Sequence, residues 1–153
     1  MMKLCSDVLK ALDGKTLVTA ESLTGGGIGA ALTAVPGASA VYKGGVVSYC
    51  DDVKHEILGV SSGVLERFGA VSAQTAAAMA QGARTLLKAD CAVSVTGLAG
   101  PGGDDHGHEV GTVFIGYADV NGSFAREYHF SGDRDTVRGQ TVCAALEIVL
   151  ENA

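Results

Sequence analysis

The sequence predicts an α/β protein, a three-layer α/β/α sandwich in which helices cover both faces of a mixed sheet. Helical and β-type hydrophobic patterns alternate through the first two thirds of the chain, as they do in parallel sheets whose strands are joined by helices. Two further β-type runs flank Asn121-Gly122, a dipeptide typical of tight hairpin turns. A C-terminal antiparallel hairpin should therefore complete the sheet.

In the first half of the chain, helices are recognised by apolar residues at every third or fourth position, and strands by short apolar or β-branched runs. Asp13-Gly14 and Pro36-Gly37 are turn signals that should each end a helix. The expected elements are a helix from Cys5 to Leu12, a strand at residues 17–20, a helix at 28–35, a strand at 45–50 and a short helix or turn at 51–58.

The second half predicts two longer helices and three strands. Ser72 and Asp133 stand where a side chain can cap the first turn of a helix. The buried faces of these two helices are expected at Ala76, Met79, Ala80, Ala83 and Leu87, and at Val142, Ala145, Leu146 and Val149. The expected strands are residues 91–96, 110–120 and 123–130.

The composition indicates one globular domain over residues 1–153. With 47% hydrophobic residues the chain can bury a substantial core, and its 22 glycines are spread over several turns instead of forming a repeat. The net charge of −6, without a cluster of Lys or Arg, argues against nucleic acid as a partner.

The expected location is the cytoplasm. Cys5, Cys50, Cys91 and Cys143 form no CxxC pair, which favours a reducing compartment. The first seven residues reach a charge too early for a signal sequence, and no apolar run is long enough to span a bilayer, so no membrane contact is expected. The apolar surplus and a hairpin at the edge of the sheet favour a homo-oligomer.

The most informative segment is the turn at Ser22, where a β-type run stops and the chain enters Gly25-Gly26-Gly27 before a helical stretch. A serine on such a strand-to-helix turn is exposed, and the N–H groups behind it point at whatever lies above it. Ser22 is therefore a candidate nucleophile or part of an anion site. Taken locally, it is equally compatible with a simple turn or helix cap.

A second segment delivers Tyr49 from a strand and Lys54 about one helical turn later. Both side chains could reach the end of the sheet that holds Ser22. A lysine desolvated among apolar and glycine-rich walls loses proton affinity and can accept a proton from a serine hydroxyl. By itself, Lys54 is also compatible with a solvated surface lysine.

A third segment, Thr96 to Gly103, is a glycine-rich loop that leaves a strand end and can bring bare backbone close to a ligand. Two such loops at one edge of a sheet form a cleft, so a small-molecule site is expected between this loop and the turn at Ser22.

Five segments resemble, in order, the successive motifs of the CinA C-terminal domain family, whose characterised enzymes are nicotinamide mononucleotide deamidases. They cover the chain from about Leu17 to the last helix. The segments are Thr19-Ala20-Glu21-Ser22-x-Thr24-Gly25-Gly26, Tyr49-x-x-x-x-Lys54, Gly69-Ala70-Val71-Ser72, Thr96-Gly97-x-Ala99-Gly100-Pro101 and Gly132-Asp133-Arg134-x-x-Val137-Arg138.

The resemblance implies the three-layer fold, in its stand-alone form, and hydrolysis of the carboxamide of nicotinamide mononucleotide to nicotinate mononucleotide and ammonia. No metal or organic cofactor is expected to be required. The implied nucleophile is Ser22, with Lys54 as its base and Tyr49 close to both. The N–H groups around Thr24, Gly25 and Gly26 would stabilise the oxyanion.

The substrate is a nucleotide, so a phosphate partner is expected as well. Backbone amides of the glycine loop at Thr96, Gly97 and Gly100 are candidates, together with one arginine of the last motif, for which Arg138 is preferred.

One departure from the family pattern bears on function. Family members commonly follow the tyrosine with Ser-Asn, whereas Cys50-Asp51 follow Tyr49 in this chain. An acidic group beside Lys54 favours the charged ammonium and opposes its use as a base. The alternative hypotheses are a non-catalytic nucleotide-binding or regulatory module that keeps the phosphate cleft, and an amidase or esterase for another small substrate.

Two further candidates have weaker support. The segment from Asp104 to Glu109 is dense in potential metal ligands, but its spacing matches no zinc template, so a solvated loop is expected. Cys50 is a rival nucleophile, but no histidine stands beside it in the sequence, so a packing role is expected.

Overall fold

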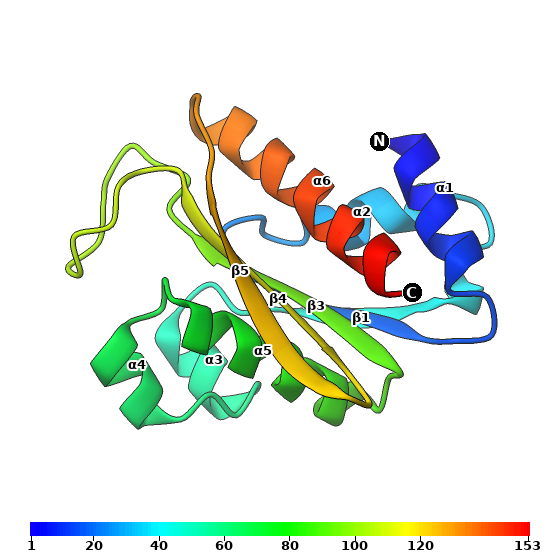
Figure 1. The fold of residues 1–153 in the computed structure, drawn as a ribbon, viewed down its shortest axis with the longest axis horizontal. Helices are drawn as coiled ribbons and strands as arrows, with labels where there is room; N and C mark the ends of the chain where they lie inside the picture. The colour runs from blue at the N-terminus through cyan, green and yellow to red at the C-terminus, as the bar shows by residue number, and fades with distance from the viewer.

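The computed structural model describes residues 1–153 and contains a five-stranded mixed sheet between two layers of helices (Figure 1). The strands are β1 (Leu17–Glu21), β2 (Tyr42–Val47), β3 (Cys91–Gly97), β4 (Thr112–Asp119) and β5 (Gly122–His129). The helices are α1 (Met2–Ala11), α2 (Gly27–Thr33), α3 (Asp51–Glu56), α4 (Ser62–Phe68), α5 (Ala73–Leu87) and α6 (Arg134–Asn152), with a 3-10 turn at Ala38–Ala40. Figure 1 shows α1, α2 and α6 on one face of the sheet and α3, α4 and α5 on the other, which confirms the predicted three-layer class. None of these helices is both long enough and apolar enough to cross a membrane.

The strand order is β2-β1-β3-β4-β5, with β1 parallel to both of its neighbours. The pairs β3–β4 and β4–β5 are antiparallel, so the predicted C-terminal hairpin is confirmed. Its two loop residues are Val120 and Asn121, because Asp119 pairs with Gly122. The backbone of Gly122 has φ 128, a conformation that side chains rarely adopt.

The second strand occupies Tyr42–Val47, so its predicted bounds of 45–50 were wrong. Glu21, the last residue of β1, lies opposite Val47, and the parallel pairing ends there. Ser48 still donates its N–H to the Glu21 carbonyl at 2.8 Å before the chain turns into α3. The glycines at 44 and 45 lower the β-propensity of the segment and conceal its start in the sequence.

The sequence did not predict α4, a single short helix at Ser62–Phe68. Ser61 caps it by accepting the N–H of Val64 at 3.1 Å, but none of its residues is fully buried. Its half-buried apolar residues, Val64, Leu65 and Phe68, cover only about one helical turn, which is too short a pattern to reveal a helix in a sequence.

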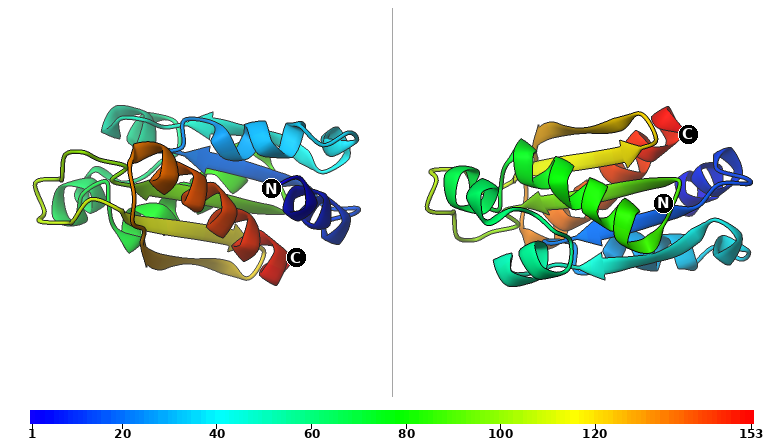
Figure 2. Two further views of the ribbon diagram at one scale, coloured as in Figure 1. Left: turned by 90° about the horizontal axis from the view of Figure 1, so that it is seen from above. Right: turned by 90° about the horizontal axis from the view of Figure 1, so that it is seen from below.

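Two large apolar cores hold the layers together, one on each face of the sheet. Figure 2 shows the helices that cover the two faces, seen from above and from below. Leu17 belongs to the core beneath α1, α2 and α6, and the next residue, Val18, belongs to the core beneath α5. Successive side chains of a strand point to opposite faces, so a strand covered on both sides is apolar throughout. This explains why β1, β3 and β4 are buried along almost their whole length and are rich in apolar residues.

Gly82 marks a close approach between α5 and the segment after α3. A Cβ at this position would overlap the backbone carbonyl of Leu58. We expect Gly82→Ala to lower the free energy of unfolding by about 1–3 kcal/mol, because packed backbone must shift. Gly139→Ala is the matched control in α6, where a Cβ meets nothing within 4 Å, and it should raise stability by about 0.4–1 kcal/mol. Denaturant unfolding measures both values, and a Gly82→Ala protein as stable as its parent would contradict the close approach.

The carboxyl ends of β1, β2 and β3 lie at the same edge of the sheet because these strands are parallel. Ligands of open α/β sheets bind at that edge, where the connecting segments leave the strands.

Candidate active site

A cavity of about 380 Å³ lies at this edge of the sheet. Its wall combines the segments that follow β1, β2 and β3, the segment before α5 and the start of α6. The lining residues include Ser22, Leu23, Tyr49, Asp51, Lys54, Ala70, Thr96, Gly97, Gly100 and Arg134. The three segments singled out in the sequence therefore meet in one cavity.

Ser22 and Lys54 are in direct contact. The Lys54 Nζ donates a hydrogen bond to the Ser22 Oγ at 3.0 Å and another to the Ser48 carbonyl at 2.6 Å. Backbone pairing holds the nucleophile, since the Ser22 N–H donates to the Val95 carbonyl at 3.0 Å. Lys54 is 1% exposed and Ser22 is 9% exposed, so this contact is formed out of bulk water.

Burial lowers the pKa of Lys54 from its ordinary value of 10.5, because a desolvated ammonium is costly. The negative charge of Asp51, at the first turn of α3, acts in the opposite direction, as does Cys50. Burial has the larger effect, so Lys54 is a stronger candidate for a neutral base than a surface lysine would be.

The turn after Ser22 differs from the expected anion site. The N–H groups of Ile28 and Gly29, in the first turn of α2, donate to the Glu21 carboxylate at 2.8 and 3.1 Å. The Thr24 hydroxyl donates to the same carboxylate at 2.6 Å. Glu21 therefore occupies the start of α2, and the three residues Thr24, Gly25 and Gly26 do not line the cavity.

The glycine-rich loop lies where the sequence predicted it. Thr96, Gly97 and Gly100 all line the cavity, and the Thr96 hydroxyl donates to the Ala70 carbonyl at 2.7 Å on the opposite wall. A Cβ at Gly97 would collide with the backbone of Thr112, so only glycine allows this approach of β3 to β4.

The two arginines of the last motif have different surroundings. Arg134 lines the cavity, and its guanidinium donates to the Gly100 carbonyl at 2.7 Å and to the Tyr49 hydroxyl at 2.8 Å. Arg138, the arginine preferred from the sequence, does not line the cavity. Its guanidinium donates to the carbonyls of Leu23 and Thr24 at 3.0 and 3.2 Å, so it supports the turn after Ser22.

Tyr49 lines the cavity but is 60% exposed, and the hydrogen bond of its hydroxyl is to Arg134. The neighbouring Cys50 is exposed and does not line the cavity.

The loop from Asp104 to Glu109 forms no metal site. The His108 Nδ1 is hydrogen-bonded to the Asp104 carboxylate at 2.7 Å, but no group of three or more acidic, histidine or cysteine side chains could hold a metal ion.

The sequence analysis missed the roles of Glu21 and Leu23, the residues on either side of Ser22. Glu21 stood in the quoted motif, and a carboxylate shortly before a helix is a recognised N-terminal signal, so Glu21 could have been found. Leu23 directly follows the candidate nucleophile, and the N–H at that position can bind an oxyanion, so its place in the sequence was also a signal.

Known proteins similar to this chain show its family. The model of the CinA C-terminal domain matches residues 1–153 of the chain. The chain belongs to the CinA C-terminal domain family. The resemblance noted in its motifs is thereby confirmed.

The relatives include longer proteins. A CinA-like protein of Geobacter metallireducens is 50% identical over 134 residues, which are 88% of this chain and 32% of that protein. A CinA-like protein of Thermosynechococcus vestitus is 49% identical over 138 residues, 88% of this chain and 33% of that protein. The chain thus spans about a third of the length of these curated relatives.

Solved structures of the family share the fold over nearly the whole chain. A CinA superfamily protein from Escherichia coli has a TM-score of 0.96 and 36% identity, covering 99% of this chain and 90% of that one. A competence/damage inducible protein from Agrobacterium tumefaciens has a TM-score of 0.94 and 40% identity, covering 98% of this chain and 93% of that one.

Proposed function

We propose that this domain hydrolyses the carboxamide of nicotinamide mononucleotide to nicotinate mononucleotide and ammonia. The observation that carries the proposal is the 3.0 Å contact between the Ser22 Oγ and the buried Lys54 Nζ. A serine paired with a lysine of lowered pKa is a nucleophile and base of the kind that acyl transfer requires. The choice of substrate follows the resemblance to the family's deamidases.

In the proposed reaction, neutral Lys54 takes the hydroxyl proton of Ser22 while the Ser22 Oγ adds to the amide carbon. The resulting ammonium of Lys54 returns the proton to the amide nitrogen, so the C–N bond breaks and ammonia leaves. Lys54 next takes a proton from water, whose oxygen attacks the ester at Ser22. Nicotinate mononucleotide is released and Ser22 recovers its proton, with no step that needs a metal or cofactor.

The cavity wall carries one guanidinium that can bind the phosphate of a mononucleotide. Arg134 brings a guanidinium to the cavity wall, whereas Arg138 is engaged with the turn after Ser22. We therefore assign the phosphate to Arg134, whose planar group can form paired hydrogen bonds to phosphate oxygens. The glycine loop at Gly97 and Gly100 would supply backbone contacts beside it.

The direct test measures ammonia and nicotinate mononucleotide released from nicotinamide mononucleotide by the purified domain, in the presence of a chelator. Equal amounts of the two products, with one oxygen atom taken from labelled water, are expected. Tight binding of the nucleotide without turnover would instead favour a non-catalytic nucleotide-binding module. The observation that favours such a non-catalytic module is the negative charge of Asp51, which opposes the lowering of the Lys54 pKa.

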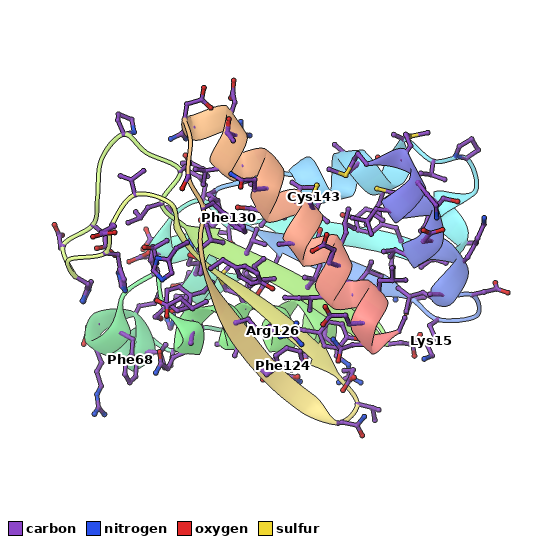
Figure 3. The ribbon with its side chains drawn as sticks, turned by 45° about the horizontal axis from the view of Figure 1, so that its top comes forward. Lys15, Phe68, Phe124, Arg126, Phe130 and Cys143 are labelled. Atoms are coloured by element: carbon purple, nitrogen blue, oxygen red, sulfur yellow. The ribbon has the colours of Figure 1, made fainter.

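Replacing Arg134 should weaken substrate binding more than it slows the chemical step. We expect Arg134→Ala to raise KM for nicotinamide mononucleotide by about 10- to 100-fold, the loss of a charge-assisted pair. Arg126→Ala is the matched control, because this arginine lies over Phe124 on the outer strand β5 (Figure 3). Steady-state kinetics separate the two parameters, and an unchanged KM in Arg134→Ala would overturn the assignment.

A further inference from the structure

The backbone around the nucleophile is held from two sides. Glu21 is 2% exposed, and its carboxylate accepts the Thr24 hydroxyl and the N–H groups of Ile28 and Gly29. On the other side, the Arg138 guanidinium donates to the carbonyls of Leu23 and Thr24. The turn is therefore fixed by two charged side chains that do not line the cavity.

Three N–H groups of this turn donate to no acceptor of the protein, those of Leu23, Thr24 and Gly26, and of these three residues only Leu23 lines the cavity. The N–H groups of Ser22, Gly25 and Gly27 donate to the carbonyls of Val95, Ser22 and Thr24. The Leu23 N–H donates to no acceptor of the protein, although the residue is only 4% exposed and lines the cavity. Buried N–H groups without a partner are rare, and an unpaired one beside a nucleophile indicates a ligand atom as its acceptor.

The orientation of this N–H follows from the peptide that carries it. The Ser22 carbonyl accepts the Gly25 N–H at 3.0 Å and so points into the turn. In a trans peptide the N–H points opposite to the carbonyl, so the Leu23 N–H points out of the turn.

We propose that the Leu23 N–H is the oxyanion donor of this site and that Glu21 is the positioning residue that aims it. When the Ser22 Oγ bonds to the amide carbon, the electron pair of the carbonyl bond moves onto oxygen, and the Leu23 N–H stabilises that charge. The N–H of the residue after a nucleophilic serine has the geometry for this role. The inference deepens the proposed amide hydrolysis and rests on it.

Glu21→Gln tests the positioning role with an isosteric change. The amide nitrogen would face the Gly29 N–H, donor against donor, so the first turn of α2 must shift. We expect kcat for nicotinamide mononucleotide to fall by about 10²- to 10³-fold, with KM changed less than about threefold. Asp90→Asn is the matched control, because Asp90 accepts the Thr16 N–H at 2.7 Å at the opposite end of the sheet.

A second readout does not depend on the substrate. An alkyl fluorophosphonate reacts as the Ser22 Oγ bonds to phosphorus, fluoride leaves and Lys54 takes the hydroxyl proton, so the phosphoryl oxygen occupies the oxyanion position. Glu21→Gln should slow this labelling by a factor similar to the fall in kcat. If the parent protein is labelled but does not hydrolyse the nucleotide, the proposed function fails while the labelling rates still test the donor.

The most direct variant replaces Leu23 by its α-hydroxy acid, which exchanges the backbone N–H for oxygen. Residues 1–49 can be synthesised and joined to residues 50–153 at the native Cys50, with the ligated all-amide chain as control. Because this N–H has no acceptor in the fold, the ester weakens only the bond from the Gly25 N–H to the Ser22 carbonyl, so the thermal midpoint should fall slightly while kcat falls about 10²-fold. Equal kcat and labelling rates in both ligated chains would overturn the proposal, whatever the effect of Glu21→Gln.

Discussion

Ser22→Ala is expected to lower kcat/KM for nicotinamide mononucleotide by about 10⁴-fold or more, the largest effect of any single change in this chain. The hydroxyl is the atom that forms the acyl-enzyme, and no other hydroxyl shares its contact with Lys54. Ammonia release measures the loss, and mass spectrometry of the parent protein should detect the acyl adduct on the Ser22 peptide.

Ser123→Ala is the control for this change, because Ser123 is an exposed serine on β5. Nucleotide binding should survive in Ser22→Ala, since the phosphate partner is assigned to Arg134. Full amide hydrolysis by Ser22→Ala would refute the serine mechanism, and it would turn attention to water activated directly by Lys54.

Lys54→Met should lower kcat by about 10²- to 10⁴-fold, the usual contribution of a positioned general base. Methionine fills a similar volume, so the fold should persist. Lys43→Met is the matched control, because Lys43 is an exposed lysine of β2 that donates to the Lys88 carbonyl. An active Lys54→Met protein would show that Ser22 needs no base from this side chain.

The same variant tests the lowered pKa through stability. The unfolded chain binds a proton at Lys54 up to about its ordinary pKa of 10.5, whereas the folded protein releases that proton at a lower pH. The free energy of unfolding should therefore rise with pH between the lowered pKa and 10.5, by at most about 1.4 kcal/mol per pH unit. Lys54→Met should remove this rise, which urea unfolding at a series of pH values measures. Activity of the parent should increase over the same range, as neutral lysine forms.

Local signals predicted local structure well. Ser72 and Asp133 were expected to cap helices, and each accepts the N–H of the residue three positions on, as a cap does. The start of β2 and the whole of α4 were not predicted, because two glycines weaken the strand pattern and the apolar pattern of α4 covers only about one helical turn. Their positions depend on pairing with β1 and on packing against α5.

The candidate site also combines features that have a local sequence signal with features that depend on tertiary packing. Arg134 and Arg138 are one helical turn apart in one motif, and nothing local distinguishes them. Only the packing of α6 turns Arg134 toward the cavity and Arg138 toward the turn after Ser22. Similarly, the residues whose N–H groups were expected to stabilise the oxyanion, Thr24, Gly25 and Gly26, do not line the cavity. The Glu21 carboxylate accepts the next N–H groups, those of Ile28 and Gly29 in α2.

Local patterns in the chain were enough to predict the α/β class, most of the helices and strands, the family, and the segments that carry Ser22, Lys54 and the glycine loop. These follow from hydrophobic periodicity, turn residues and motifs, which act over a few neighbouring positions. Three properties became visible only in the folded protein: Lys54 is buried against Ser22, Arg134 faces the cavity, and the Leu23 N–H has no acceptor. Those properties depend on the register between distant strands, because burial and hydrogen-bond partners exist only once the sheet brings these segments together.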